Sequence, residues 1–293
     1  MTTWLDAGPP ALGAAVGADT SLEGGWLVRA FRAGDGLDGP PGILQGGLAA
    51  TLPSVVARLS DPFGAPLTSV TARLHAPTPL GRQLQAALRP ADGVARHEVQ
   101  LRDGDQLLVS ATVELAGRDR PPAVPDLVEL ALCELPPQRH QRTYPRCFVC
   151  GPDSPHPHAL RCTYGYVRDD AVALPWLAEE ALGAAPVARR GGRDEAPVVI
   201  DPVVVGAALD CPGVWAATPA LTDAGFAGCL LAGMEVRWYR DAPTYEPLRL
   251  VARHDELDGR KVRVRTALID EDGAVYAVAS ALHIAVHEVP SLR

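Results

Sequence analysis

Gly47-Leu48-Ala49-Ala50-Thr51-Leu52-Pro53-Ser54 and Gly206-Ala207-Ala208-Leu209-Asp210-Cys211-Pro212-Gly213 are two versions of one sequence pattern. Each stretch begins with glycine, runs mostly apolar for about one helical turn, and then reaches a proline. Further apolar residues at helical spacing follow both stretches, so each predicts a buried helix. Pro53 is expected to bend the first helix or to mark where a preceding turn gives way to it, because proline cannot donate a backbone hydrogen bond.

The strands predicted after the two helices also match each other. The segment from Val70 to His75 aligns with the segment from Met234 to Tyr239, and their apolar positions alternate in the same phase. Since side chains alternate with period two along a strand, chance similarity would break this phase half the time. We interpret the chain as a duplicated α+β unit, with one helix and several antiparallel strands in each copy. The alternative is two unrelated helices in a sequence rich in Ala, Leu and Gly.

The length of 293 residues suits two domains of ordinary size. Residues 1–20 are rich in Gly, Pro and Ala and are expected to form a loose N-terminus. The first unit is expected over residues 21–118 and the second over residues 147–293. Between them, residues 119–146 are rich in proline and are interpreted as a linker.

Composition and charge exclude several classes of function. Hydrophobic residues make up 47% of the chain, so a large core is expected, and the net charge of −8 disfavours a nucleic-acid-binding surface. The sequence has no signal-peptide pattern and no apolar stretch long enough to predict a membrane span. Its six cysteines are too sparse for a disulfide scaffold. We therefore expect a cytoplasmic protein with reduced thiols.

Three motifs carry a resemblance to a known fold. A helix that begins with Gln45-Gly46-Gly47 and is wrapped by an antiparallel sheet resembles the hotdog fold. The segments Cys147-Phe148-Val149-Cys150-Gly151 and Leu209-Asp210-Cys211-Pro212-Gly213 resemble motifs of its thioesterase-like branch. The resemblance covers most of the chain in two copies, so the chain resembles a double hotdog protein of the acyl-CoA thioesterase-like superfamily. Such a chain forms a pseudo-dimer of two long helices, each wrapped by an antiparallel sheet.

This resemblance implies hydrolysis, or at least binding, of an acyl thioester at the interface of the two units. The small-molecule partner would then be an acyl-CoA-like thioester. No cofactor is expected beyond the CoA of the substrate, and the expected assembly is a homodimer of double-hotdog chains. A non-catalytic ligand-binding or interaction module on the same fold is the alternative.

Two departures from the family pattern bear on activity. Many such thioesterases carry histidine before the Gly-Gly pair, where this chain has Gln45, and the second copy has Val204-Val205-Gly206 instead. The two halves are therefore expected to differ and to form at most one working site. The hydratase branch uses an Asp/His pair, and neither helix start shows one, which disfavours hydratase activity.

Asp210 is the strongest candidate for catalysis. Burying a carboxylate in an apolar helix segment is costly, and the side chain could orient or deprotonate a water molecule. The alternative is an ordinary helix cap, with Pro212 in the first turn. Thr51 is the counterpart of Asp210 in the first copy. Its hydroxyl, like the Gln45 amide, could position water or the substrate carbonyl.

The backbone amides of Gly46 and Gly47, with Gly206 as the second-copy equivalent, are candidates for holding an oxyanion or substrate. The alternative is that the two glycines only permit a tight turn. Arg142 and Arg146 belong to a basic run that could contact CoA phosphates, although a solvated linker is the more common use of such residues.

The Cys147-x-x-Cys150 motif, with His156, His158 and Cys162 nearby, could form a zinc site. The second ligand pair of a zinc knuckle is missing, so reduced structural cysteines and no metal are expected. Cys211 has no histidine nearby in sequence to activate it and is expected to be a buried apolar residue.

Overall fold

The computed structural model describes residues 15–61, 64–91, 95–183 and 198–289. The first unit contains, in chain order, β1 (Ala15–Glu23), β2 (Trp26–Arg32), α1 (Gly46–Thr51), α2 (Pro53–Ser60), β3 (Leu67–Leu74), β4 (Gln83–Pro90), β5 (Arg96–Asp103) and β6 (Gln106–Leu115). The rest of the chain contains α3 (Pro125–Leu132), β7 (Gly165–Arg168), β8 (Ala171–Trp176), a 3-10 turn (Glu180–Leu182), α4 (Pro202–Ala208), α5 (Cys211–Asp223), β9 (Gly228–Trp238), β10 (Leu248–Asp258), β11 (Lys261–Asp270) and β12 (Val275–Val286).

Both predicted core helices are broken at the same place in the repeated pattern. In the first unit, α1 ends at Thr51 and α2 begins at Pro53. In the second unit, α4 ends at Ala208 and α5 begins at Cys211, with Pro212 in its first turn. Proline fits the first turn of a helix, where its missing N–H leaves no hydrogen bond unmade. A proline therefore stands in the first turn of the second piece of each core helix. The sequence predicts this interruption at Pro53, whereas for the second helix it offers Pro212 in a first turn only as the alternative explanation of Asp210.

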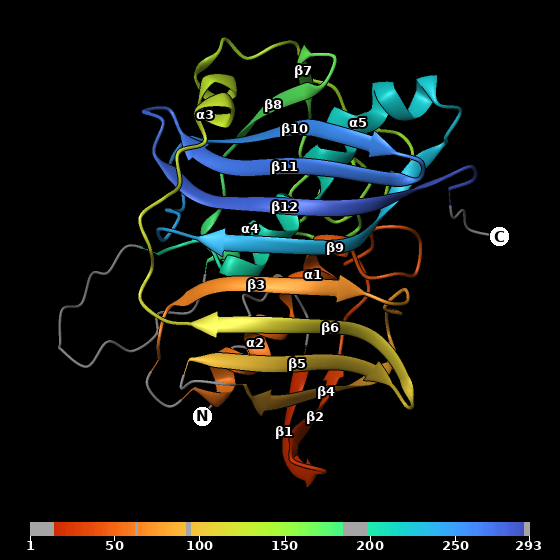
Figure 1. The fold of residues 1–293 in the computed structure, drawn as a ribbon, viewed down its shortest axis with the longest axis vertical. Coiled ribbons are helices and arrows are strands. Elements are labelled where there is room, and N and C mark those ends of the chain that lie inside the picture. Colours follow the sequence, from red (N-terminus) through yellow and green to blue (C-terminus); the bar gives the residue numbers. More distant parts are fainter. Residues whose placement is uncertain (1–14, 62–63, 92–94, 184–197, 290–293) are drawn as a thin grey trace.

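All twelve strands of the described chain form one antiparallel sheet, in the order β1-β2-β4-β5-β6-β3-β9-β12-β11-β10-β8-β7. The two units join where β3 pairs with β9 at the centre of this sheet (Figure 1). The repeat alignment puts Thr71 opposite Glu235, and these two residues pair with each other in the sheet. A pseudo-twofold axis therefore passes through this pair, and the chain is the pseudo-dimer that the sequence predicts.

The main core lies between the four helices α1, α2, α4 and α5 and one face of the sheet. A second, smaller apolar cluster lies on the other face of the second unit, where Leu127 and Leu130 of α3 pack against Val251 and Ile269. The sheet of the second unit is thus covered on both sides. Its strands are rich in apolar residues on both faces for this reason.

The structure differs from the sequence expectations at both ends of the first unit. A strand, β1, already begins at Ala15, inside the stretch expected to be loose, while residues 1–14 lie outside the described part of the chain. The proline-rich linker contains a helix, α3, which Asp126 fastens to the sheet through ion pairs with Arg253 and Arg265. The expected linker is therefore partly a structural layer of the second unit.

The combined segment Pro202–Asp223 is long and apolar enough, by length and composition, to cross a membrane, which the sequence reading did not anticipate. Within the fold, 78% of its most apolar window is buried against the sheet and the other helices. The segment is also interrupted between α4 and α5. This is the arrangement of a core helix.

Candidate active site

The two core helices cross at glycine residues. A side-chain carbon at Gly47 would lie 2.6 Å from the Gly206 carbonyl oxygen and 2.9 Å from the Cα of Ala207. A side-chain carbon at Gly206 would overlap the Thr51 side chain. The repeated glycine therefore lets the backbones of α1 and α4 approach closely, and this approach brings the start of α1 to the break between α4 and α5.

Asp210 lies at that break, and groups from both units hold its carboxylate. Its Oδ2 accepts hydrogen bonds from the Gln45 side-chain amide at 2.7 Å and from the Gly47 N–H at 2.9 Å. Its Oδ1 lies 3.1 Å from Nε2 of His283 on β12. The side chain makes no capping bond to α5, although Asp210 occupies the N-cap position. The carboxylate is therefore used across the interface between the units and does not act as a helix cap.

His283 was missed by sequence reasoning, which found no Asp/His pair near either helix start. The structure forms such a pair across 73 residues of sequence. The signal in the sequence was a histidine on the buried face of an otherwise apolar strand, in line with Ala279, Ala281 and Ala285. His283 is fully buried, and its Nδ1 has no hydrogen-bond partner within the described part of the chain.

Gln45 caps α1 and contacts the second unit at the same time. Its side-chain oxygen accepts a hydrogen bond from the Leu48 N–H at 2.8 Å, which orients the amide so that the nitrogen faces Asp210. The same nitrogen lies 3.7 Å from the Cys211 sulfur. Gln45 is only 1% exposed, so both ends of its amide are satisfied in the interior.

A cavity of about 410 Å³ opens beside this cluster. Gln45, Gly46, Asp210 and His283 line it, together with apolar side chains of α5 and β9 that include Val214, Trp215, Leu230 and Leu231. The cavity thus joins one group of buried polar residues to a largely apolar wall. This combination is typical of small-molecule sites.

The other predicted site residues fall into two groups. Gly46 and Arg142 line the cavity, with Arg142 exposed to solvent. Among the described residues, the lining does not include Gly47, Gly206, Thr51 or Arg146. Both glycine N–H groups belong to the first turn of α1 and have no acceptor within the helix. The Gly47 N–H is bonded to Asp210, which leaves that of Gly46 as the candidate donor to a substrate.

Thr51 has a packing role in the structure. Its hydroxyl donates to the carbonyl oxygen of Gly47 at 2.7 Å, one turn earlier in the helix, and lies 3.4 Å from the Val203 carbonyl. A helical threonine commonly satisfies its hydroxyl in this way. The two repeat-equivalent positions are therefore unlike, since Asp210 faces the cavity while Thr51 is fully buried in the helix crossing.

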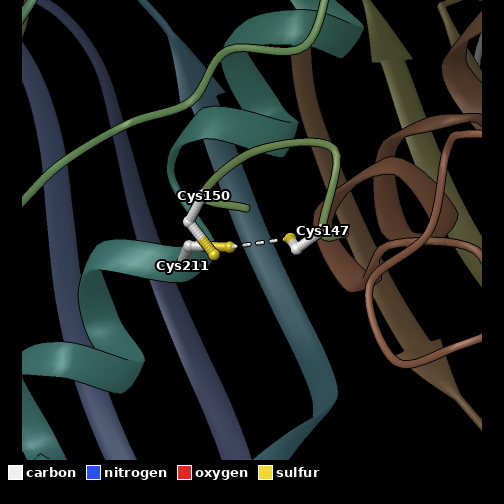
Figure 2. A group of neighbouring side chains, drawn as sticks. All are labelled: Cys147, Cys150 and Cys211. Carbon is white, nitrogen blue, oxygen red and sulfur yellow. Dashed lines mark hydrogen bonds between the residues drawn. The ribbon is translucent and has the colours of Figure 1, made fainter. Parts of the chain in front are cut away.

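Three cysteines meet beside Asp210 (Figure 2). The Cys147 and Cys211 sulfur atoms are 3.9 Å apart, and Cys150 completes the group. Hydrogen bonds from Cys150 and then Cys211 lower the pKa of Cys147 well below its ordinary value, although burial opposes this effect. The histidines considered for a zinc site lie elsewhere: the His156 ring stacks edge-on against Phe148, and its Nδ1 accepts from the His158 N–H.

Comparisons with known proteins agree with this architecture. No protein-family model and no curated protein matches the sequence. Among solved structures, the acyl-CoA thioesterase II TesB2 from Mycobacterium marinum superposes with a TM-score of 0.57 at 12% identity, covering 94% of this chain and 96% of its own. A conserved protein of unknown function with the hot dog fold, from Alicyclobacillus acidocaldarius, gives 0.60 at 13% identity, covering 92% and 97%.

A third solved structure, the dehydratase domain of a mycocerosic acid synthase-like PKS, gives a TM-score of 0.58 at 15% identity. The match covers 96% of this chain and 97% of that domain. Structural matches at such low sequence identity show the fold and no finer property. Together with the sheet order and the paired core helices, they show that the chain has the hotdog fold, with two hotdog units in one polypeptide.

Proposed function

We propose that the chain hydrolyses an acyl thioester, such as an acyl-CoA, in the cavity at the interface of its two units. The observation that carries this proposal is the buried Asp210 carboxylate, which is held from one unit by Gln45 and Gly47 and from the other by His283. Burying a carboxylate among apolar side chains costs free energy, and a buried carboxylate at a cavity is therefore a candidate for function. Asp210 lines the cavity, where it can contact a small molecule.

Asp210 and His283 act together on the attacking water in this mechanism. When His283 donates its Nε2–H to Asp210, the lone pair of the ring remains on Nδ1, so the pair contains both a carboxylate and a neutral imidazole. Either group can accept a proton from water as the oxygen bonds to the thioester carbonyl carbon. The C–S bond then breaks, the thiol leaves with a proton, and a carboxylic acid is formed.

The remaining groups position the substrate. The Gly46 N–H, at the start of α1, is the candidate donor to the carbonyl oxygen as negative charge develops on it. The apolar wall formed by residues such as Trp215 and Leu231 would hold the acyl group. Arg142 is exposed and lines the cavity, and in this proposal it would contact a CoA phosphate.

The test is a thiol-release assay on acyl-CoA substrates of increasing chain length, comparing the wild-type chain with Asp210→Asn and His283→Gln. Removing a proton-transferring group is expected to lower kcat by a factor of about 10²–10⁴ for either variant. Asp223→Asn, at an exposed position in α5, is the matched control and should retain wild-type activity. Wild-type inactivity on the whole panel, or an Asp210→Asn variant as active as the wild type, would contradict hydrolysis.

Two other functions give different results in the same experiment. A non-catalytic module would bind acyl-CoA in calorimetry without releasing thiol. A lyase that adds or removes water is favoured by one observation, the buried Asp210–His283 pair. It would change an enoyl thioester or a hydroxyacyl thioester, measured by absorbance of the conjugated bond, while the thioester itself stays intact.

A further inference from the structure

Three thiols from two distant segments converge at one point of the fold. Cys147 and Cys150 lie on the turn that follows the proline-rich segment, and Cys211 is the first residue of α5. Their sulfur atoms all lie within 4.8 Å of one another, and each residue is buried. Figure 2 shows the three side chains directed at one another from these two segments. Cys162 and Cys229 are also buried but stand outside the group.

The spacing of the sulfur atoms is that of a metal-thiolate site. Bonds of about 2.3 Å from zinc to each sulfur of a tetrahedral site place neighbouring sulfur atoms about 3.8 Å apart. The Cys147 and Cys211 sulfurs are already 3.9 Å apart. Only small movements of the side chains are therefore needed for all three sulfurs to share one ion.

The turn that carries two of the thiols is built closely around them. The Gly151 N–H donates to the Cys147 carbonyl at 2.8 Å, and a side-chain carbon at Gly151 would overlap the backbone of Cys147 and Pro145. Two cysteines separated by two residues are a common ligand pair of structural zinc sites.

Groups around the cluster are suited to support metal-bound thiolates. The Gln45 side-chain nitrogen lies 3.7 Å from the Cys211 sulfur and can donate to it. The Tyr144 hydroxyl is buried and has no hydrogen-bond partner in the described part of the chain. Tyr144 and all three cysteines line the cavity, so a fourth ligand can reach the ion from the cavity side.

We propose that Cys147, Cys150 and Cys211 bind one Zn²⁺ ion through three thiolates, with the fourth coordination position facing the cavity. Thiolate ligands favour zinc over Mg²⁺ or Ca²⁺, which bind oxygen. On binding, the thiols lose their protons to solvent and the sulfurs bond to the metal, with no change of oxidation state. The ion would fasten the 147–150 turn to the start of α5, next to Asp210. This proposal is independent of whether the cavity hydrolyses a thioester.

The sequence alone disfavours this site because it places only two cysteines near each other and lacks a second ligand pair. The third ligand comes from the repeated helix pattern, 64 residues from Cys147. Folding therefore brings Cys211 to the pair as the third ligand. The sequence pattern had suggested the histidines and Cys162 for this role.

The test uses the full chain, purified with reductant and Zn²⁺ and then desalted, with zinc measured by elemental analysis. The expected content is about one zinc per chain. Cobalt(II) substitution should give sulfur-to-metal charge-transfer absorption and the visible bands of a tetrahedral site. Cys147→Ser and Cys211→Ser should lose the metal, whereas Cys133→Ser, at a half-buried position outside the group, should keep it.

Circular dichroism checks that the variants are folded. If a variant does not fold, the cobalt spectrum of the wild-type chain still reports whether thiolates bind the metal. The site is overturned if the reduced wild-type chain holds no zinc and its six thiols all react after denaturation. It is also overturned if Cys211→Ser retains the metal. A Cys147–Cys211 disulfide in the chain purified without reductant, with no zinc bound after reduction, would identify the group as a redox pair instead.

Discussion

Individual side chains in this protein have chemical properties that follow from where the two units meet. Asp210 is 6% exposed and accepts hydrogen bonds from the Gln45 side chain and from the Gly47 N–H of α1, while its Oδ1 lies 3.1 Å from Nε2 of His283 on β12. No single unit contains all of these partners. The hydrogen bonds of this carboxylate therefore form only when the two units pack correctly against each other.

His156 gives a prediction for pH dependence. Burial, and then the nearby positive charges of His158 and Arg161, lower its pKa from 6.5 to about 4. The unfolded chain binds the proton more readily, so His156 should reduce stability as pH falls from 6.5 to 4 and add nothing further below that range. We expect His156→Gln to flatten this part of the curve of unfolding free energy against pH, measured by urea denaturation.

His140→Gln, at an exposed position, is the control for the His156 experiment and should leave the curve unchanged. Asp126, whose pKa is lowered chiefly by a hydrogen bond from Arg265, also makes the fold sensitive to acid, but equally so in every variant. Identical slopes for wild type and His156→Gln between pH 6.5 and 4 would contradict the prediction.

Sequence reasoning proposed Asp210 as a candidate but did not propose His283. A charged residue in an apolar helix segment is conspicuous within its own segment. The Asp210–His283 pair, by contrast, exists only after β12 pairs with β9 beneath α5, which is a long-range consequence of the sheet order. The sequence also could not show that Thr51 and Asp210 have different roles. Only the packing of Thr51 against Gly206 shows that its side chain lies in the helix crossing.

At the level of elements, the crossing of α1 and α4 determines the position of the candidate site. Gly206→Ala would place a methyl group against the Thr51 side chain, inside a helix contact with no free space. We expect the free energy of unfolding to fall by about 1–3 kcal/mol, as is usual for an overpacked core. Denaturation by urea measures this loss, and the same change should weaken any activity, because α1 carries Gln45.

Gly117→Ala is the matched control, since a side-chain carbon there meets no atom within 4 Å and the backbone conformation is ordinary. A Gly206→Ala variant as stable as Gly117→Ala would show that the helices can separate without cost.

The interruption at Pro53 was predictable because proline acts locally, and the first-turn position of Pro212 agrees with the alternative that the sequence offered for Asp210. The strands of the repeat were predictable from their alternation. β1 was not, because Ala15–Glu23 contains Gly, Asp, Thr and Ser without a clear apolar face, and its place depends on pairing with β2. Similarly, α3 lies in a proline-rich segment, and its structural role depends on the sheet face that it covers.

For the molecule as a whole, the continuous sheet predicts that the two units unfold together. β3 and β9 pair at the centre of the sheet, and the main core includes residues of both units, so neither half can open without exposing the other. Native-state hydrogen exchange should therefore show the slowest amides of β5 and of β11 opening with the same free energy. Gly206→Ala should lower both by equal amounts. Protection that falls in β11 alone would mean that the units open separately.

The pairing of Thr71 with Glu235 has one further consequence. Two separate, identical subunits would have to carry every substitution on both sides of their axis, whereas a fused pair can specialise each side. Here the polar side has Gln45 with Asp210, and the related positions across the axis are Val204 and Thr51, which only pack. For the described residues we therefore expect a symmetrical scaffold with one chemical centre, which would bind a ligand of that centre in a one-to-one ratio.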